Sequence, residues 1–341
     1  MLQVGLIGAG YFSGFHIDAW RRLNEVNLLA IAEIDDKRRE YLSSEFPDIK
    51  LYRSVEDLLS ENQIDILDIA TPPSTHRAIL REVVNSVKMI ICQKPFCVSL
   101  GEAEEIAEMI KNTRSTLVIH ENFRFQPWYR KIKSIISSEG LGDVMQAQFR
   151  LRPGDGAGAD AYLDRQPYFR NMKKFLIHET GIHWIDVFRY LFGIPQTVYS
   201  DLRQLNPEIS GEDAGYFIFG YAEGQRAVFD GNRLLDHPAD NHRLTMGEFV
   251  VEGTRATITL NGDAELYLRN KGENEGQKIA YEVSLKGFGG DCVYHFQNHI
   301  IDYCLGRGEL ENSVESYLRN LVLENHIYES ALSGRRCMVE M

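Results

Sequence analysis

Over the first 120 residues, short apolar runs alternate with segments of helical periodicity. The apolar runs have the length and composition of buried strands and lie at 2–8, 28–34, 65–70, 88–93 and 116–122. Between them the pattern predicts helices at 11–23, 36–45, 55–60, 74–87 and 99–112. Ser54 and Ser74 are candidate N-caps, and Ser99 with Glu102 forms a capping box. Strands separated by helices indicate a parallel, doubly wound sheet.

The pattern changes after Asn122. A helix is expected over 127–138, and strand-like alternation follows at 143–152, 215–222, 226–234, 247–262 and 264–270. Long strands in succession predict an open, mostly antiparallel sheet. Two helical segments, 176–193 and 314–334, interrupt and end this series. We therefore expect an α/β protein with a doubly wound domain at 1–122 and an α+β domain at 123–341, since 341 residues exceed one typical core.

Composition narrows the class of protein. A net charge of −12 argues against a nucleic-acid or anionic-membrane partner. No apolar run approaches the ~20 residues of a membrane span, and the N-terminal stretch lacks the marks of a signal peptide. Five scattered cysteines without a C-x-x-C pair indicate reduced thiols. We expect a cytoplasmic protein whose partner is a small molecule, with no membrane contact.

A glycine-rich turn joins the first predicted strand to the first helix in "VGLIGAGYFSGFH". Gly8 permits a tight turn, and Gly10 lets the backbone approach a pyrophosphate at the helix N-terminus. Ser13 replaces the third glycine of the G-x-G-x-x-G pattern and is small enough for close packing. Tyr11 and Phe12 belong to the same turn, so we assign them to the cofactor site as well.

An acidic residue accompanies this turn. Glu33 ends the second strand, where a carboxylate accepts hydrogen bonds from the ribose hydroxyls and repels a 2′-phosphate. The next residue, Ile34, is not a cation, so the pattern favours NAD over NADP. Asp35 is better explained as a helix cap. The alternative, that the glycines only form a turn, is weakened by Glu33 and by the strand–helix alternation.

Two other strand ends carry candidate site residues at the sheet edge where ligands bind. Thr71 and Pro72 follow the strand at 65–70 and are expected to line the cofactor cleft. His76 either reaches that cleft or lies on a helix surface. Lys94 follows the strand at 88–93, where a cation can hydrogen-bond a substrate oxygen, although a surface lysine after a strand is common.

The stretch "LIHETGIHWIDVFRYLFG" resembles a zinc-binding H-E-x-x-H helix at first sight. His178 and His183 are five residues apart, about 140° round a helix, so they are poorly placed to hold one metal ion. Glu179 and His183 are four apart and share a face, with Asp186 nearby. A carboxylate beside an imidazole suits proton transfer, whereas the alternative is an ordinary polar helix face.

Taken together, the motifs resemble the Gfo/Idh/MocA family, which includes glucose–fructose oxidoreductase and inositol dehydrogenase. The likeness covers almost the whole chain. It rests on six segments in the family's order: "GLIGAGYFSGFH", "ATPPSTH", "CQKPF", "ENFRFQPWYRKIK", "HETGIHWID" and "YESALSGRR". Two departures stand out, because Gln93 replaces the Glu of the E-K-P signature and Glu179 replaces the first Asp of D-x-G-x-H-x-x-D.

The resemblance implies roles for these residues. Lys94, Glu179 and His183 would form the catalytic group of an NAD(P)-dependent dehydrogenase acting on a secondary alcohol of a sugar or polyol. Gln93 would border the cofactor beside Lys94, and Asn122 and Arg124 would line the nicotinamide end of the site. Asp186 is expected to be structural, and His178 either touches substrate or packs. No metal is implied, and relatives suggest a homodimer or homotetramer formed through the second-domain sheet.

Other interpretations remain at this stage. Some family members are glycosidases that hold NAD tightly, and a few are non-enzymatic sensors. The cationic residues between 150 and 174 suggest an acidic or phosphorylated sugar, although neighbouring aspartates favour a solvated loop of mixed charge.

Overall fold

The computed structural model describes residues 1–341, which divide into two compact units. The first unit comprises Met1–Asn122 and Asp291–Arg319, and the second comprises Phe123–Gly290 and Asn320–Met341. The change of pattern after Asn122 therefore coincides with a division between the units. The sequence analysis assigned 291–319 to the second domain, whereas these residues belong to the first unit.

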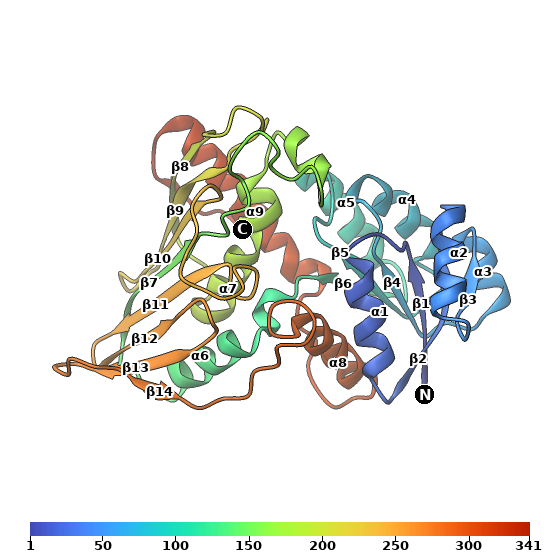
Figure 1. The fold of residues 1–341 in the computed structure, drawn as a ribbon, viewed down its shortest axis with the longest axis horizontal. Coiled ribbons are helices and arrows are strands. Elements are labelled where there is room, and N and C mark those ends of the chain that lie inside the picture. The colour runs from blue at the N-terminus through green and yellow to red at the C-terminus, as the bar shows by residue number, and fades with distance from the viewer. The chain divides into compact units, whose positions relative to one another are not determined.

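The first unit contains a six-stranded sheet in the order β3-β2-β1-β4-β5-β6, in which every pairing is parallel (Figure 1). This is the order of a dinucleotide-binding Rossmann sheet, so the predicted doubly wound fold is confirmed. The strands are β1 (Leu2–Ile7), β2 (Val26–Ala32), β3 (Lys50–Tyr52), β4 (Ile66–Ile69), β5 (Met89–Gln93) and β6 (Thr116–His120). The helices of the alternating part are α1 (Ser13–Arg22), α2 (Asp36–Glu45), α3 (Val55–Glu61), α4 (Pro73–Val83) and α5 (Leu100–Lys111).

Helix caps explain several of these boundaries. The side chains of Ser54 and Ser99 accept hydrogen bonds from the backbone N–H groups of Asp57 and Glu102, as the sequence predicted. Ser74 is not a cap, because α4 already begins at Pro73. Proline is favoured at a first helical position, where its missing N–H group costs no hydrogen bond.

A segment remote in the sequence completes the first unit. Helix α8 (Cys292–Cys304) contacts α1, and the guanidinium of Arg22 forms a bidentate ion pair with Asp291 at 2.6 and 2.8 Å. Arg307 pairs with Glu25 at the start of β2, and the Asn312 side chain donates to the backbone carbonyl of Glu121. These long-range contacts are not encoded in any local pattern, which is why the sequence analysis missed both the helix and its placement.

The second unit contains a nine-stranded sheet in the order β14-β13-β12-β11-β7-β10-β9-β8-β15. Only the β7–β10 pairing is parallel, so the predicted mostly antiparallel sheet is confirmed. Figure 1 shows α6, α7 and α9 on the same side of this sheet. The strands are β7 (Val144–Leu151), β8 (Thr197–Arg203), β9 (Ala214–Gly220), β10 (Arg226–Asn232), β11 (Gly247–Gly253), β12 (Ala256–Leu260), β13 (Leu266–Asn270), β14 (Gln277–Ile279) and β15 (Cys337–Met338). The helices are α6 (Pro127–Ser137), α7 (Ile182–Phe192) and α9 (Val314–Ser333), of which the residues from Asn320 onward belong to this unit.

Two features of this sheet differ from the expectation. The segment 247–262 forms two strands, β11 and β12, joined at Thr254–Arg255, rather than one long strand. Strand β8 was missed, because half-exposed polar residues obscure its alternation. The face that carries the helices buries aromatic rings that pack against α7 and form the core of the unit. Trp184 of α7 meets the sheet residues Phe149 and Phe229, and the core also includes Phe217 and Phe249.

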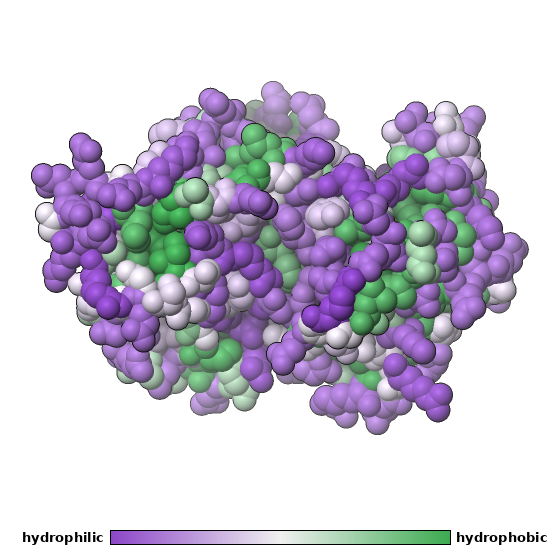
Figure 2. Space-filling view, turned by 90° about the horizontal axis from the view of Figure 1, so that it is seen from below, coloured by the Kyte–Doolittle hydropathy of each residue, from purple (hydrophilic) through white to green (hydrophobic).

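The face seen in Figure 2 is mainly hydrophilic, and apolar residues form separate patches among hydrophilic ones. None of the helices has both the length and the apolar character that crossing a membrane requires.

Candidate functional site

The glycine-rich turn has the geometry that its sequence predicted. Gly8 follows β1 with φ +89°, in the left-handed region that glycine adopts most easily. A Cβ atom at this position would also lie 2.8 Å from the Thr71 side chain. At Gly10, an added Cβ would meet no protein atom within 4 Å, so open space lies in front of the backbone there. That space is what the approach of a pyrophosphate requires.

Helix α1 starts directly after this turn without a side-chain cap. Phe12 occupies the cap position, and its aromatic ring contacts Phe15 and His16. Ser13 is 1% exposed, as close packing requires, and its hydroxyl oxygen has no hydrogen-bond partner. Tyr11 is exposed and meets the edge of Phe15. The uncapped helix start and the unpartnered hydroxyl suit a ligand with phosphate oxygens.

Glu33 lies just beyond β2 and is 4% exposed. Its carboxylate accepts hydrogen bonds from the backbone N–H groups of Ala9, at 2.7 Å, and Asp35, at 2.9 Å. Asp35 caps α2 by accepting from the N–H of Arg38, which agrees with the expected capping role. The Arg38 guanidinium lies 3.9 Å from the Glu33 carboxylate, although the sequence analysis considered only Ile34 as a neighbouring cation position. Glu33 thus supports the glycine turn.

The turn after β4 is braced by His76. This imidazole is fully buried, and its two ring nitrogens lie 2.9 Å from the Phe96 carbonyl oxygen and 2.8 Å from that of Thr71. Burial lowers the pKa of His76, against the opposing effect of these carbonyls. Thr71 accepts a hydrogen bond from the Thr75 hydroxyl, while Pro72 is exposed at the start of α4. His76 therefore holds two strand-end turns together, a supporting role rather than the cofactor contact assigned from sequence.

A chain of buried polar groups leads to Lys94. Asp68 in β4 accepts hydrogen bonds of 2.8 Å from the Trp20 indole and from the Nδ1 atom of His16. The Nε2 atom of His16 lies 3.0 Å from the side-chain nitrogen of Gln93. The Gln93 side-chain oxygen then accepts from the backbone N–H of Lys94 at 2.6 Å. The sequence analysis assigned Gln93 and Lys94 but attached no role to His16 or Asp68.

Asp68 carries a negative charge in this chain. Burial alone would raise its pKa, but the interaction with His16 and weaker contributions from His120 and Trp20 outweigh burial and lower the pKa. An aspartate inside an apolar strand was the signal in the sequence that could have revealed this network, because a buried carboxylate requires partners.

Asn122 follows β6 and is 3% exposed. Its side-chain nitrogen is buried without a hydrogen-bond acceptor. Such unsatisfied donors are uncommon in folded proteins and suit a site that receives an acceptor from a ligand.

In the second unit, the segment that begins the His-Glu motif is a π-helix, Leu176–Gly181, which continues into α7. The backbone N–H of Ile182 bonds to the carbonyl of Ile177, five residues earlier. The sequence analysis assumed α-helical rotation throughout, so its angle of about 140° between His178 and His183 was wrong. The wider turn rotates less per residue and brings Glu179 and His183 closer to alignment. Such π segments occur frequently at functional sites.

His183 is 5% exposed and its ring stacks on Phe123, with centroids 3.7 Å apart and planes 3° apart. Glu179 is 8% exposed. His178 instead pairs with Glu324 of α9 at 2.7 Å. Of the two histidines in the motif, His183 is therefore held as a flat, oriented ring, whereas His178 packs against a neighbouring helix.

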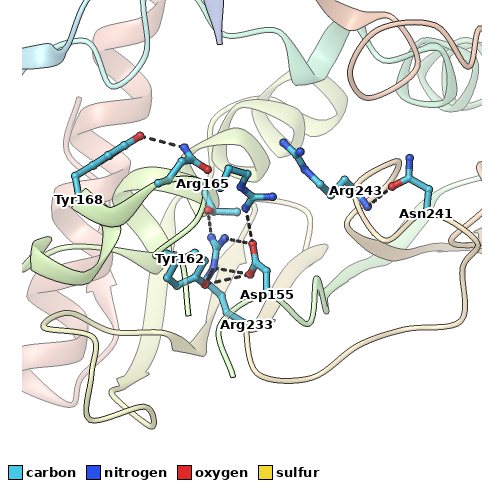
Figure 3. A network of polar contacts seen from close by, with 9 residues as sticks. Asp155, Tyr162, Arg165, Tyr168, Arg233, Asn241 and Arg243 are labelled. Carbon is cyan, nitrogen blue, oxygen red and sulfur yellow. Dashed lines mark hydrogen bonds and ion pairs between the residues drawn. The ribbon is translucent and has the colours of Figure 1, made fainter. Parts of the chain in front are cut away.

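Arg233 is 2% exposed and holds the π-helix through the hydroxyl of Thr180. Figure 3 shows its guanidinium beside Asp155 and Tyr162. The guanidinium donates to the hydroxyls of Thr180 and Tyr162 and to the carboxylate of Asp155. Arg165 donates to the same carboxylate at 3.1 Å. Burial would raise the pKa of Asp155, but the two guanidinium groups lower it, so its charge is balanced. The sequence analysis did not identify Arg233, because its partners lie 53 to 78 residues away in the chain.

Arg124 is paired with Asp186 inside the second unit. Its guanidinium makes two hydrogen bonds to the carboxylate, of 2.7 and 2.6 Å, and Asn320 donates to the same group. Asp186 is structural, as expected. This pair gives Arg124 a structural role and makes it a weaker candidate for the nicotinamide end of the site than Asn122.

Comparison with known proteins agrees with this geometry. Residues 2–121 match the sequence profile described as "Oxidoreductase family, NAD-binding Rossmann fold", and residues 129–259 match the Gfo/Idh/MocA C-terminal domain. D-apiose dehydrogenase of Rhizobium rhizogenes is 27% identical over 98% of this chain and 96% of its own. Inositol 2-dehydrogenase of Corynebacterium glutamicum is 24% identical over 73% of this chain and 78% of its own.

A similar crystal structure supports the same class of protein. An oxidoreductase from Agrobacterium radiobacter, solved with NAD+, L-tartaric acid and magnesium, superposes with a TM-score of 0.88 at 26% identity, covering 99% of this chain and 98% of that one. The fold and the strand-end residues define an oxidoreductase with an NAD-binding Rossmann domain. The chain belongs to the Gfo/Idh/MocA family. The open space at Gly10, the unpartnered Ser13 hydroxyl and the placement of Glu33 fit the dinucleotide of such an enzyme.

Proposed function

We propose that the protein transfers a hydride between a secondary alcohol of a sugar, cyclic polyol or related carbohydrate and a nicotinamide cofactor. The observation that carries this proposal is that Lys94 and His183, which are expected to contact the substrate hydroxyl, are each held in place by a neighbouring side chain. The Gln93 side chain holds the Lys94 backbone, and the Phe123 ring holds His183. The names of the relatives from Rhizobium and Corynebacterium, an apiose and an inositol dehydrogenase, support the same substrate class.

Each residue has a defined task in this proposal. The bound nicotinamide supplies the hydride acceptor. During alcohol oxidation His183 takes the hydroxyl proton, and Lys94 donates a hydrogen bond to the oxygen on which negative charge develops. Glu179, one turn before His183, orients the imidazole or contacts a second hydroxyl. In the reverse direction His183 returns the proton.

The decisive experiment is a panel of sugars and polyols followed by NADH absorbance. With a substrate in hand, His183→Ala should lower kcat by about 10²–10⁴-fold, the usual contribution of one general base, with nearly unchanged NAD affinity. Lys94→Ala should lower kcat by a similar factor and should also raise KM. His326→Ala is the matched control, because this histidine pairs with Glu329 on α9 and has no assigned role.

The outcomes separate the alternatives. Turnover within a few-fold of wild type in both variants would refute the assignment. Hydrolysis of a glycoside without net change in NADH would identify a glycosidase, and tight NAD binding without any turnover would identify a sensor.

We propose that NAD is preferred over NADP, with Gly8, Gly10, Tyr11 and Phe12 forming the pyrophosphate turn. The buried Glu33 carboxylate accepts from the ribose hydroxyls and repels a 2′-phosphate. Glu33→Ala should reduce the preference for NAD over NADP. The Arg38 guanidinium, 3.9 Å from the Glu33 carboxylate, then becomes available to the 2′-phosphate of NADP.

Titration calorimetry with both cofactors tests this preference. Adding Arg38→Ala to Glu33→Ala should reverse the gain in NADP affinity, which isolates the cation's contribution. Tighter binding of NADP than NAD by the wild type would contradict the proposal.

We propose that the protein is a homodimer or homotetramer joined through the outer face of the nine-stranded sheet. This face lacks helices, and its half-buried side chains include Tyr199, Tyr216, Ile218, Val228 and Val250. Sedimentation of the wild type should show an oligomer, and Ile218→Arg with Val228→Arg should dissociate it. A wild-type monomer at micromolar concentration would overturn this. The five cysteines form no disulfide, which suits the reducing cytoplasm, where we propose that the protein works.

A further inference from the structure

The hydrogen bonds between Lys94 and Asp68 admit a single assignment of protons. A backbone N–H can only donate, so the Gln93 atom 2.6 Å from the Lys94 nitrogen must be the amide oxygen. The Gln93 NH2 group therefore faces His16 and donates to its Nε2 atom at 3.0 Å. Nε2 then bears the lone pair, and Nδ1 carries the proton that is donated to Asp68. His16 is thus a neutral imidazole with a defined tautomer.

This state depends on residue 93 being an amide. A carboxylate there, as in the family's E-K-P signature, would accept from both the Lys94 N–H and His16. His16 would then lie between two carboxylates and would carry a proton on each nitrogen. Because Gln93 replaces Glu in this chain, the arrangement keeps one negative charge, on Asp68, and no positive charge on His16.

The surroundings of His16 offer few other charges. The His120 ring of β6 stacks on it at 4.2 Å, and the Phe12 ring meets it edge-on. Cys92 lies next to Gln93, and burial raises the pKa of its thiol, so it stays neutral. From α8, the Gln297 side chain donates only to the backbone carbonyl of His16, at 3.4 Å. Asp68 and His120 are titratable groups in direct contact with the imidazole.

We propose that Gln93 and His16 are positioning residues that couple the protonation of His16 to the placement of Lys94. Neutral His16 accepts from the Gln93 amide, which turns the amide oxygen toward the Lys94 N–H and fixes the backbone there. When His16 takes a second proton from solvent, at Nε2, the amide must rotate to offer its oxygen to that N–H. Its NH2 group then faces the Lys94 N–H, so the hydrogen bond that holds Lys94 is lost. The consequence for turnover rests on the proposed role of Lys94, whereas the coupling itself does not.

The coupling is tested without substrate by long-range ¹H–¹⁵N spectra of histidine-labelled protein, with His16→Asn identifying the His16 signals. At neutral pH the wild type should show one protonated nitrogen, Nδ1, and one unprotonated nitrogen, Nε2. Gln93→Glu should show both nitrogens protonated at the same pH. Wild-type His16 that is protonated on both nitrogens, or on Nε2 alone, would overturn the proposal, as would an unchanged pattern in Gln93→Glu.

Kinetics test the consequence for Lys94. Gln93→Leu removes the acceptor and should lower kcat about tenfold, the effect of one lost hydrogen bond, with NAD affinity within twofold of wild type. Gln93→Glu keeps an acceptor for the Lys94 N–H, so its kcat should fall less than that of Gln93→Leu and should depend less on pH on the acid side than the kcat of the wild type. Gln297→Leu is the control, since it borders His16 without touching the ring and should keep the wild-type pH profile.

These outcomes distinguish the two proposals. An identical acid limb in wild type and Gln93→Glu, with both folded by thermal unfolding, would refute the coupling to Lys94. If no substrate turns over, the spectra still decide whether Gln93 sets the protonation of His16, and only the proposed function fails.

Discussion

The two units each hold an aspartate in a polar network beside their candidate functional residues, fully buried at Asp68 and half-buried at Asp155, but the partners differ in kind. Asp68 in the first unit is held by the N–H groups of Trp20 and a neutral His16. Asp155 in the second unit is held by two guanidinium groups, those of Arg233 and Arg165. Arginine stays charged at any physiological pH, whereas an imidazole gains or loses a proton within it. The cluster of Asp155, Arg233 and Arg165, called the Arg233 clamp below, therefore keeps fixed charges. The network around Asp68 instead includes an imidazole whose proton placement we propose to depend on Gln93.

The largest effect is expected where a fixed charge loses its only counter-charge. Asp155→Ala leaves the buried Arg233 guanidinium with two hydroxyl partners and no carboxylate. Breaking a buried pair in this way costs about 3–5 kcal/mol of unfolding free energy. Urea unfolding followed by circular dichroism measures it.

Substituting the other member of this ion pair should destabilise the protein less. Arg233→Met should cost less than Asp155→Ala, because Asp155 keeps its ion pair with Arg165. If the two variants were equally destabilised, Arg233 would not depend on Asp155 and the clamp would be misassigned.

The next largest effect is expected in the dependence of the unfolding free energy on acidic pH. The pKa of both aspartates is lowered in the folded protein, so each stabilises the fold at pH values above its ordinary, unfolded pKa of about 3.9. This stability is lost as the pH falls through the folded pKa of each group. Unfolding free energy should therefore decline from about pH 4 downward.

Separate variants test the two contributions to the acid limb. Asp68→Asn and Asp155→Asn should each flatten part of the decline when urea midpoints are compared between pH 3 and 6. A decline that is unchanged in both variants would show that other carboxylates cause it.

The sequence predicted what local patterns encode. The Rossmann strands, the caps Ser54 and Ser99 and the tight turn at Gly8 all follow from local sequence patterns. These features depend on residues close to one another in the chain, which is why they could be recognised.

What sequence could not predict depends on distant partners. The Arg233 clamp joins residues 53 to 78 positions apart, and His16 meets Asp68 and Gln93 across 52 and 77 positions. The π-helix was also missed, because its composition is that of an ordinary helix start. For the same reason, α8 was not assigned to the first unit.

The smallest effects are expected from two aromatic donors that occupy equivalent places in the two networks. Trp20→Phe removes one N–H donor from Asp68 and leaves His16, so it should cost about 1 kcal/mol of unfolding free energy. Tyr162→Phe removes a hydroxyl that donates to Asp155 and accepts from Arg233, so two hydrogen bonds are lost and the cost should be about twice as large. Both substitutions keep the aromatic core nearly intact, which limits cavity effects.

The same pair also tests which partners control the charge of each aspartate. Trp20→Phe withdraws the smallest of the contributions that lower the pKa of Asp68, after those of His16 and His120. That pKa should rise slightly toward its ordinary value, so the decline in unfolding free energy below about pH 4 should become slightly smaller. Tyr162→Phe should likewise change the decline only slightly, because the guanidinium groups of Arg233 and Arg165 contribute more than Tyr162 to lowering the pKa of Asp155. Urea midpoints of the two variants, measured across the acid range, test this directly. A large reduction of the decline in either variant would mean that a neutral donor, rather than His16 or the guanidinium groups, controls the charge of that aspartate.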